Sequence, residues 1–134
     1  MEKPYFSELE KNGINVHAGL VYAGGDEKLY AEILQDFAYN MKRNKSVISG
    51  LFSQKDIKNY GVKVHALKGI ARTIGAAALS EKAKALEEAA KENDVAFIEE
   101  NHMEMITEYE GLAKRLKKWC ADFPELIIGK STGL

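Results

Sequence analysis

The chain has 134 residues and a mass of 14.9 kDa, enough for one hydrophobic core but not for two. Hydrophobic residues make up 46% and charged residues 29%, which is typical of a soluble globular protein. No apolar run approaches the ~20 residues that a membrane-spanning helix needs. The formal net charge of −1 provides no overall field for nucleic acid or for an anionic membrane. We therefore expect one soluble domain over residues 1–134 that binds neither.

The N-terminus and the cysteine content both favour a cytoplasmic protein. The first residues lack the pattern of an export signal, in which a basic segment precedes an apolar one. Cys120 is the only cysteine, so it cannot form an internal disulfide. We expect a cytoplasmic location.

The first half of the chain predicts four helices. Two short ones are expected near residues 4–12 and 15–22. The sequence Gly24-Gly25-Asp26 then indicates a loop that ends in an N-cap. After it, apolar residues recur at helical spacing until roughly residue 48, namely Leu29, Ile33, Phe37 and Met41. The next helix is expected to begin near residues 53–56 and to run to Gly75.

The second half predicts two more helices. Ser80 can cap one of them, with Ala83, Leu86 and Ala90 facing inward, and Asn93-Asp94 marks the next turn. The last helix carries an apolar seam of about three heptads: Val95, Ile98, His102, Met105, Tyr109, Leu112, Leu116 and Trp119. Pro124 opposes its continuation. The pattern predicts an all-α fold, an antiparallel up-down four-helix bundle with short additional N-terminal helices. Its core spans about residues 8–121, and residues 122–134 form a tail of unknown role.

The stretch VKVHALKGIARTIGA, residues 62–76, places a histidine opposite the predicted core face of its helix. At ~100° per residue, the apolar side chains share an arc that His65 does not enter. This arc contains Tyr60, Val64, Leu67, Ile70, Ala71 and Ile74. We therefore expect Leu67 to pack in the core and His65 to be exposed. Lys63 falls inside the apolar arc and does not fit the pattern.

The residues that share the face of His65 favour an acquired negative charge. Gly61 and Gly69 lie one turn before and after it, although glycine inside a helix costs about 1 kcal/mol relative to alanine. Bare backbone at these positions would let a bulky group approach the ring. Lys68 and Arg72 can stabilise an anion held there, such as a phosphoryl group. No carboxylate lies within one turn on this face, so nothing there is placed to hold Mg²⁺ or to activate water.

The segment HALKGIARTIGA, residues 65–76, resembles the signature of histidine-containing phosphotransfer (HPt) domains. In that signature, lysine follows the phosphorylated histidine at +3, glycine at +4 and often a small residue at +10; here these are Lys68, Gly69 and Gly75. The resemblance covers roughly residues 8–116. It implies that Nε2 of His65 takes a phosphoryl group from the aspartate of one receiver domain and passes it to the aspartate of another.

The resemblance also implies a phosphorelay carrier rather than an enzyme. The receiver would supply Mg²⁺ and the acidic pocket, so we expect neither a cofactor nor a metal site in this chain. Receiver domains of response regulators would be transient partners of a monomer in a histidine kinase pathway. We expect them to dock on Val62 and Ala76, with Lys58 at the polar rim. Gly75 would serve helix packing near the site.

Other functions stay open at this point. The chain could be a non-catalytic adaptor that binds a receiver without carrying phosphate, or the excised phosphoacceptor domain of a chemotaxis-type or hybrid histidine kinase. A dimerisation-type sensor kinase is disfavoured, because its acceptor histidine is normally followed by an acidic residue and Ala66 follows here. A metal-dependent enzyme is also disfavoured, because the three histidines lack ligand spacing. We expect His102 to lie in the core and His17 on the surface.

Overall fold

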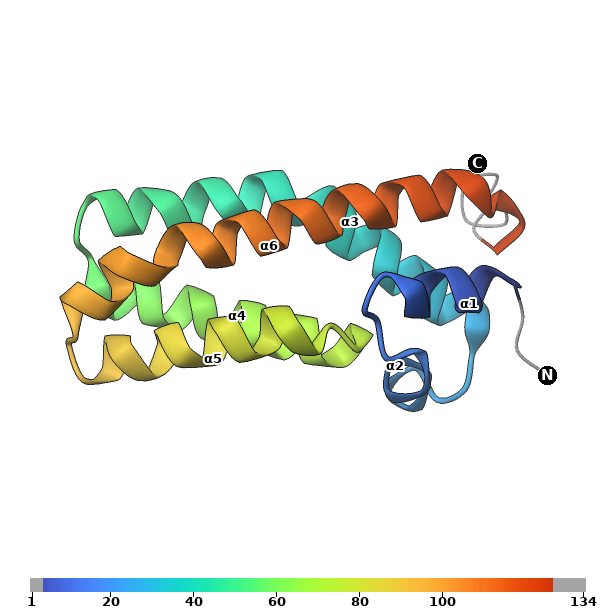
Figure 1. Ribbon diagram of the computed structural model, residues 1–134, viewed down its shortest axis with the longest axis horizontal. Helices are drawn as coiled ribbons and strands as arrows, with labels where there is room; N and C mark the ends of the chain where they lie inside the picture. The colour runs from blue at the N-terminus through green and yellow to red at the C-terminus, as the bar shows by residue number, and fades with distance from the viewer. Residues whose placement is uncertain (1–3, 127–134) are drawn as a thin grey trace.

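The computed structural model describes residues 4–126, which form six α-helices and one 3₁₀ turn and contain no strand. The helices are α1 (Pro4–Lys11), α2 (Val16–Tyr22), α3 (Glu27–Ser53), α4 (Ile57–Ile74), α5 (Ala77–Lys91) and α6 (Val95–Asp122), and η1 (Pro124–Leu126) follows. The predicted helical bundle is confirmed. It consists of α3 to α6, and the colour gradient in Figure 1 runs in opposite directions along consecutive helices. No helix in the described range is long and apolar enough to cross a membrane.

Aspartate caps begin the three long helices α3, α4 and α6; the caps of α3 and α6 lie where the sequence predicts them, and Asp56 lies within the range predicted for the start of α4. The side chains of Asp26, Asp56 and Asp94 each accept a hydrogen bond from the backbone N–H three residues later, at 3.0 to 3.3 Å. Such a bond satisfies one of the N–H groups that the first helical turn leaves without a partner. Of the predicted tail, residues 127–134 lie outside the described range.

The turn between α4 and α5 differs from the prediction. Gly75 ends α4 in the left-handed region, at φ 87°, and reverses the chain at once, so that α5 already begins at Ala77. The expectation that Ser80 caps this helix is therefore wrong. Its hydroxyl instead donates to the backbone carbonyl of Lys68 at 3.4 Å, which joins α5 to the helix that carries His65.

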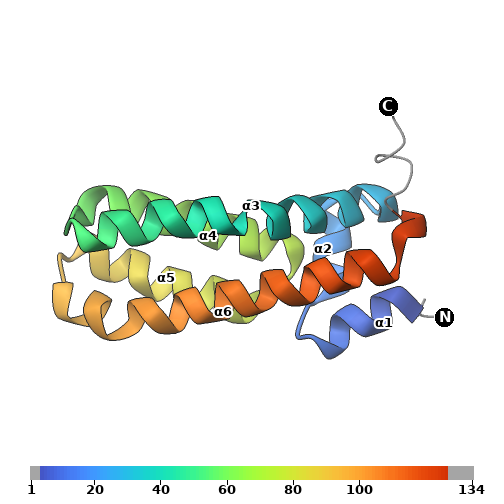
Figure 2. The same cartoon turned by 90° about the horizontal axis from the view of Figure 1, so that it is seen from above.

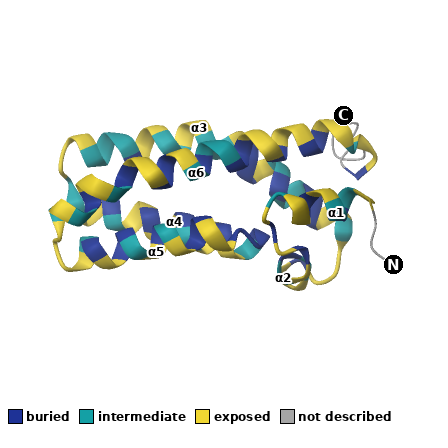
Figure 3. Cartoon of the chain, viewed as in Figure 1, coloured by how far each residue is buried: buried dark blue, intermediate teal, exposed yellow. Residues whose placement is uncertain are grey.

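The core-facing seam of α4 is narrower than the predicted arc (Figure 3). Its buried side chains are Tyr60, Val64, Leu67, Ala71 and Ile74, which alternate steps of four and three. Ile70 lies at the edge of this seam and is 41% exposed, so its predicted burial is wrong. Lys63 lies on the same edge and is also exposed, which explains why it did not fit the wider arc.

The seam of α6 is confirmed, and it includes a buried histidine. His102 is buried between α3 and α4, where the Phe52 ring stacks on it at 4.1 Å and the Tyr60 hydroxyl lies 2.8 Å from its Nδ1. Burial lowers the pKa of His102, which favours the neutral ring. His102 is therefore a core residue, as predicted, and His17 is exposed.

The two short helices close the end of the bundle at which α4 meets α5 (Figures 1 and 2). The Tyr30 hydroxyl donates to the carbonyl of Ile74 at 2.8 Å, and the backbone N–H of Asn15 donates to the carbonyl of Gly75 at 2.9 Å. Trp119 Nε1 donates to the carbonyl of Tyr5 at 2.7 Å. Tyr30 of α3 and Asn15 before α2 thus fix the end of α4, nearly three turns beyond His65.

Candidate functional site

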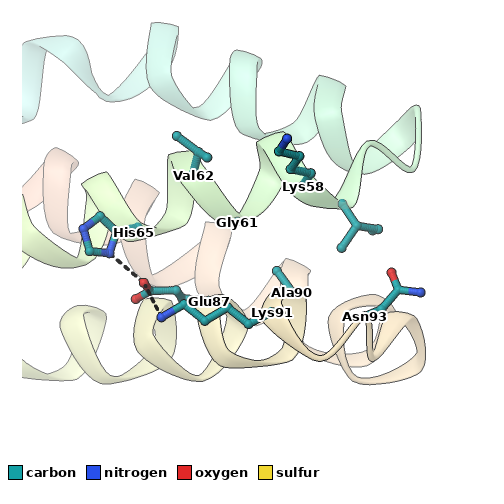
Figure 4. Close-up of a pocket in the computed structure, with 9 residues that line it drawn as sticks. Lys58, Gly61, Val62, His65, Glu87, Ala90, Lys91 and Asn93 are labelled. Atoms are coloured by element: carbon teal, nitrogen blue, oxygen red, sulfur yellow. Dashed lines mark hydrogen bonds and ion pairs between the residues drawn. The ribbon is translucent and has the colours of Figure 1, made fainter.

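His65 projects from the exposed face of α4, with its ring held at one nitrogen. Its side chain is 64% exposed, and Nδ1 lies 2.6 Å from Oε2 of Glu87 on α5. Figure 4 shows Nδ1 turned toward this carboxylate and the other ring nitrogen, Nε2, pointing away from it. The ring is therefore oriented by the neighbouring helix while Nε2 stays accessible.

Glu87 is buried, with a side chain only 6% exposed, and it is surrounded by cationic donors. Lys68 Nζ lies 2.7 Å from Oε1, and Lys91 Nζ lies 3.4 Å from Oε2. These contacts lower the pKa of Glu87 to about 2; the hydrogen bond from Lys68 contributes most, burial opposes it, and the bond from His65 adds to it. The carboxylate is thus ionised at any pH near neutrality.

The ionised carboxylate decides which nitrogen of His65 can react. A carboxylate only accepts hydrogen bonds, so Nδ1 must carry the proton of the bond to Glu87. In the neutral ring, Nε2 then keeps its lone pair. The geometry therefore presents an exposed nitrogen nucleophile that needs no further base to remove a proton.

The contact of Glu87 with His65 was not predicted from the sequence. No carboxylate of α4 lies near His65, as the sequence shows, but α5 brings the carboxylate of Glu87, 22 positions later in the chain, to the ring. One signal was present in the sequence. Glu87 occupies a position in the apolar stripe of its helix, next to Leu86 and between Ala83 and Ala90. A charged residue in such a stripe requires a partner when it is buried.

The two flanking glycines have different surroundings. A Cβ added at Gly69 would meet nothing within 4 Å, so the surface one turn after His65 is open. A Cβ added at Gly61 would lie 3.0 Å from the Cβ of Ala90, which is tighter than ordinary contact. Gly61 therefore allows α4 and α5 to pack closely, in addition to any role in access.

The remaining candidate residues differ in where the structure places them. Lys58 and Val62 are exposed and line a hollow of about 490 Å³ between α4 and α5, together with His65 and Lys91. Arg72 is exposed on the same face of α4. Leu67 is buried in the core, and Gly75 forms the end of α4. Lys68 is only 18% exposed, and its ammonium contacts Glu87. Its predicted role, to stabilise a phosphoryl group, would require it to leave this contact.

Ala76 is buried at the turn between α4 and α5, so the expectation that it contacts a partner is wrong. The turn at Gly75 folds Ala76 inward, as the backbone bond from its N–H to the carbonyl of Ala71 shows at 2.8 Å. Among residues 4–126, no group of three or more histidine, cysteine or acidic side chains is arranged to hold a metal ion.

A comparison with protein-family models finds a match over the segment that contains this site. A family model, described as the Hpt domain, matches residues 32–121, a segment that includes His65, Lys68 and Glu87. No curated protein and no solved structure matches the chain significantly. The family match covers well over half of the sequence and confirms the resemblance that the motif indicated. This chain therefore belongs to the Hpt domain family.

Proposed function

We propose that this protein is a phosphorelay intermediate in which His65 accepts a phosphoryl group from one receiver aspartate and passes it to another. Membership of the Hpt family implies phosphotransfer in two-component signalling, with receiver domains as partners and a carrier rather than an enzyme. The observation that carries the proposal for His65 is its exposed Nε2 with Nδ1 held by an ionised carboxylate. A cytoplasmic location, a monomeric state and transient partners stay predictions.

The proposed transfer needs no proton movement at the ring. The Nε2 lone pair attacks phosphorus, the bond between phosphorus and the aspartyl oxygen breaks, and the receiver carboxylate leaves with the electron pair. Nδ1 keeps its proton and donates it in the hydrogen bond to Glu87, and the carboxylate stabilises the positive charge that the ring acquires. Transfer to the second receiver is the reverse step. Mg²⁺ and the acidic pocket would come from the receiver, as in other phosphoryl transfers that rely on a bound metal.

Open space and positive charge around His65 support this reaction. The surface at Gly69 can admit a phosphoaspartate. Lys68 and Arg72 lie one and two turns after His65, where they can stabilise the phosphoryl group. The Glu87 carboxylate is bound to Nδ1, Lys68 and Lys91 on the side of the ring away from Nε2, so it is not placed to activate water at a phosphoryl group there, which suits a group that is stored rather than hydrolysed.

The charges near His65 also favour a partner with an acidic surface. Residues 37–75 contain eight lysine and arginine residues and a single acidic one, Asp56, although the whole chain carries a net charge of −1. Exposed apolar side chains on α3 and α4 lie within this basic region, namely Val47, Val62 and Ile70. We propose that a receiver docks here through an apolar centre with carboxylates around it.

The acceptor role is tested by labelling. Incubation with a phosphorylated receiver should give this protein an acid-labile, alkali-stable label, which His65→Gln should abolish. Equal labelling of that variant would overturn the assignment. If the protein is an adaptor that carries no phosphate, the His65→Ala variant should retain full activity in cells. If a kinase with labelled ATP, but no phosphorylated receiver, labels His65, the chain acts as the phosphoacceptor domain of a histidine kinase.

The docking face is tested separately. Ile70→Glu should slow transfer from the receiver about tenfold or more, because it places a charge in the apolar centre. Met103→Glu is the matched control, since Met103 is an exposed apolar side chain on α6, away from the proposed face. Equal transfer by the two variants would exclude this docking face and leave the role of His65 intact.

A further inference from the structure

Two lysines contact one buried carboxylate at the site, and they differ in how firmly they are held. Lys68 Nζ lies 2.7 Å from Oε1 of Glu87. Lys91 Nζ lies 3.4 Å from Oε2, the oxygen that also binds His65, and Figure 4 shows both residues at the carboxylate. The Lys68 side chain is 18% exposed, whereas that of Lys91 is 73% exposed. In the unphosphorylated protein, Lys68 is thus the main partner of Glu87, and Lys91 is a second, solvated one.

A phosphoryl group on Nε2 would compete for Lys68. It brings about two negative charges to the side of the ring that faces away from Glu87. Lys68 follows His65 by one helical turn on α4, so its ammonium is the nearest one along the helix that can turn to this group. The hydrogen bond from Lys68 is also the largest single contribution to the ionisation of Glu87. Its loss would leave a buried carboxylate poorly compensated, which is unfavourable.

We propose that Lys91 takes over the Glu87 carboxylate when Lys68 turns to the phosphoryl group on His65. Lys91 already lies near Oε2, and its i,i+4 spacing from Glu87 on α5 allows a direct hydrogen bond after a small movement. The Glu87 carboxylate then has a lysine partner whether or not His65 is phosphorylated, and the phosphoryl group has Lys68. Nδ1 of His65 keeps its ionised partner throughout. Lys91 is in this sense a positioning residue, and its role rests on the proposed phosphorylation of His65.

The test uses phosphoramidate as the donor, so that no receiver is needed. Lys91→Met should accept the phosphoryl group about three to ten times more slowly than the wild type, because Lys68 can no longer leave Glu87 without loss. Lys91→Arg should restore the rate. Lys84→Met is the matched control, since Lys84 is an exposed lysine of α5 and its replacement by methionine removes the same charge. Equal rates for the two methionine variants would overturn the proposal.

A nitrogen-15 spectrum of the His65 ring gives a second readout that general loss of charge would not change. In unphosphorylated Lys91→Met, the Nδ1 proton should exchange with solvent as slowly as in the wild type, because Lys68 still holds Glu87. In the phosphorylated variant it should exchange faster than in the phosphorylated wild type. Equal exchange in the two phosphorylated proteins would also overturn the proposal. Failure of every receiver to exchange phosphate with His65 would instead refute the relay function.

Discussion

The replacement Glu87→Gln removes a buried charge while it keeps the size of the side chain. The pKa of Glu87 falls from an ordinary 4.5 to about 2 in the folded protein. At about 1.4 kcal/mol for each tenfold change in proton affinity, this corresponds to about 3 kcal/mol of unfolding free energy. His65 and Lys91, two of the three groups that contact the carboxylate, are 64% and 73% exposed, so solvent screens part of this contribution. We therefore expect the variant to be less stable by about 1 to 3 kcal/mol near neutral pH.

The lowered pKa of Glu87 also determines how the unfolding free energy depends on pH. Since the pKa of Glu87 is lower in the folded state, its contribution is complete above the unfolded value of 4.5 and is lost as the pH falls toward about 2. The stability difference between wild type and Glu87→Gln should therefore shrink over this acidic range. Urea unfolding followed by the fluorescence of Trp119, the single tryptophan, measures it at each pH.

Glu88→Gln is the matched control for these measurements, because Glu88 is the exposed neighbour on the same helix. Glu87→Gln should also accept a phosphoryl group about 100-fold more slowly, since Lys68 and Nδ1 of His65 bind different oxygens of the carboxylate and the amide replaces one of these oxygens by an NH₂ donor. The reasoning is refuted if Glu87→Gln is no less stable than Glu88→Gln near neutral pH, or if the difference between them is unchanged in acid.

Three further changes test other parts of the structure. Gly69→Leu should raise the unfolding free energy by a few tenths to about 1 kcal/mol but slow transfer from a receiver, because it fills open surface beside the ring; undiminished transfer would contradict the access argument. Burial lowers the pKa of His102, so at acidic pH the unfolded chain binds a proton that the folded protein does not. The unfolding free energy should therefore decrease as the pH falls below 6.5, the pKa of His102 in the unfolded chain. Urea unfolding should show a smaller acid loss for His102→Gln, and an equal loss would count against it. Gly75→Ala should lower the unfolding free energy by about 2 kcal/mol or more, because the residue has φ 87° and its Cβ would lie 2.2 Å from the carbonyl oxygen of Asn15. A thermal midpoint within a degree or so of wild type would refute this.

Local rules predict most of the helices and the exposure of His65. Aspartates at positions 26, 56 and 94 act as caps because their side chains reach N–H groups only three residues away. The same rules overestimate the buried face of α4. Ile70 and Lys63 share an edge that the bundle leaves exposed, since each helix of a bundle buries a narrow seam against its neighbours.

The partner of His65 could not be predicted from local rules, because it depends on the register between two helices. The contact between His65 and Glu87 requires the turn at Gly75 to place α5 at one particular height beside α4. Helical spacing fixes which residues share a face of one helix, but it does not fix how far that helix slides along the next. The sequence thus predicted the exposed histidine, and the residue that orients its ring followed only from the tertiary structure.

The hydrogen bonds at the end of α4 determine how short a working fragment can be. The carbonyls of Ile74 and Gly75 accept from Tyr30 and Asn15, residues that precede the segment 32–121 matched by the family. A fragment cut to that segment would leave both carbonyls without these donors and would uncover the end of the core. The family match therefore marks the part of the chain that carries the chemistry. We expect the smallest unit that folds to extend further, back through α2 and into α1, because Asn15 precedes α2 and Tyr5 of α1 accepts from Trp119.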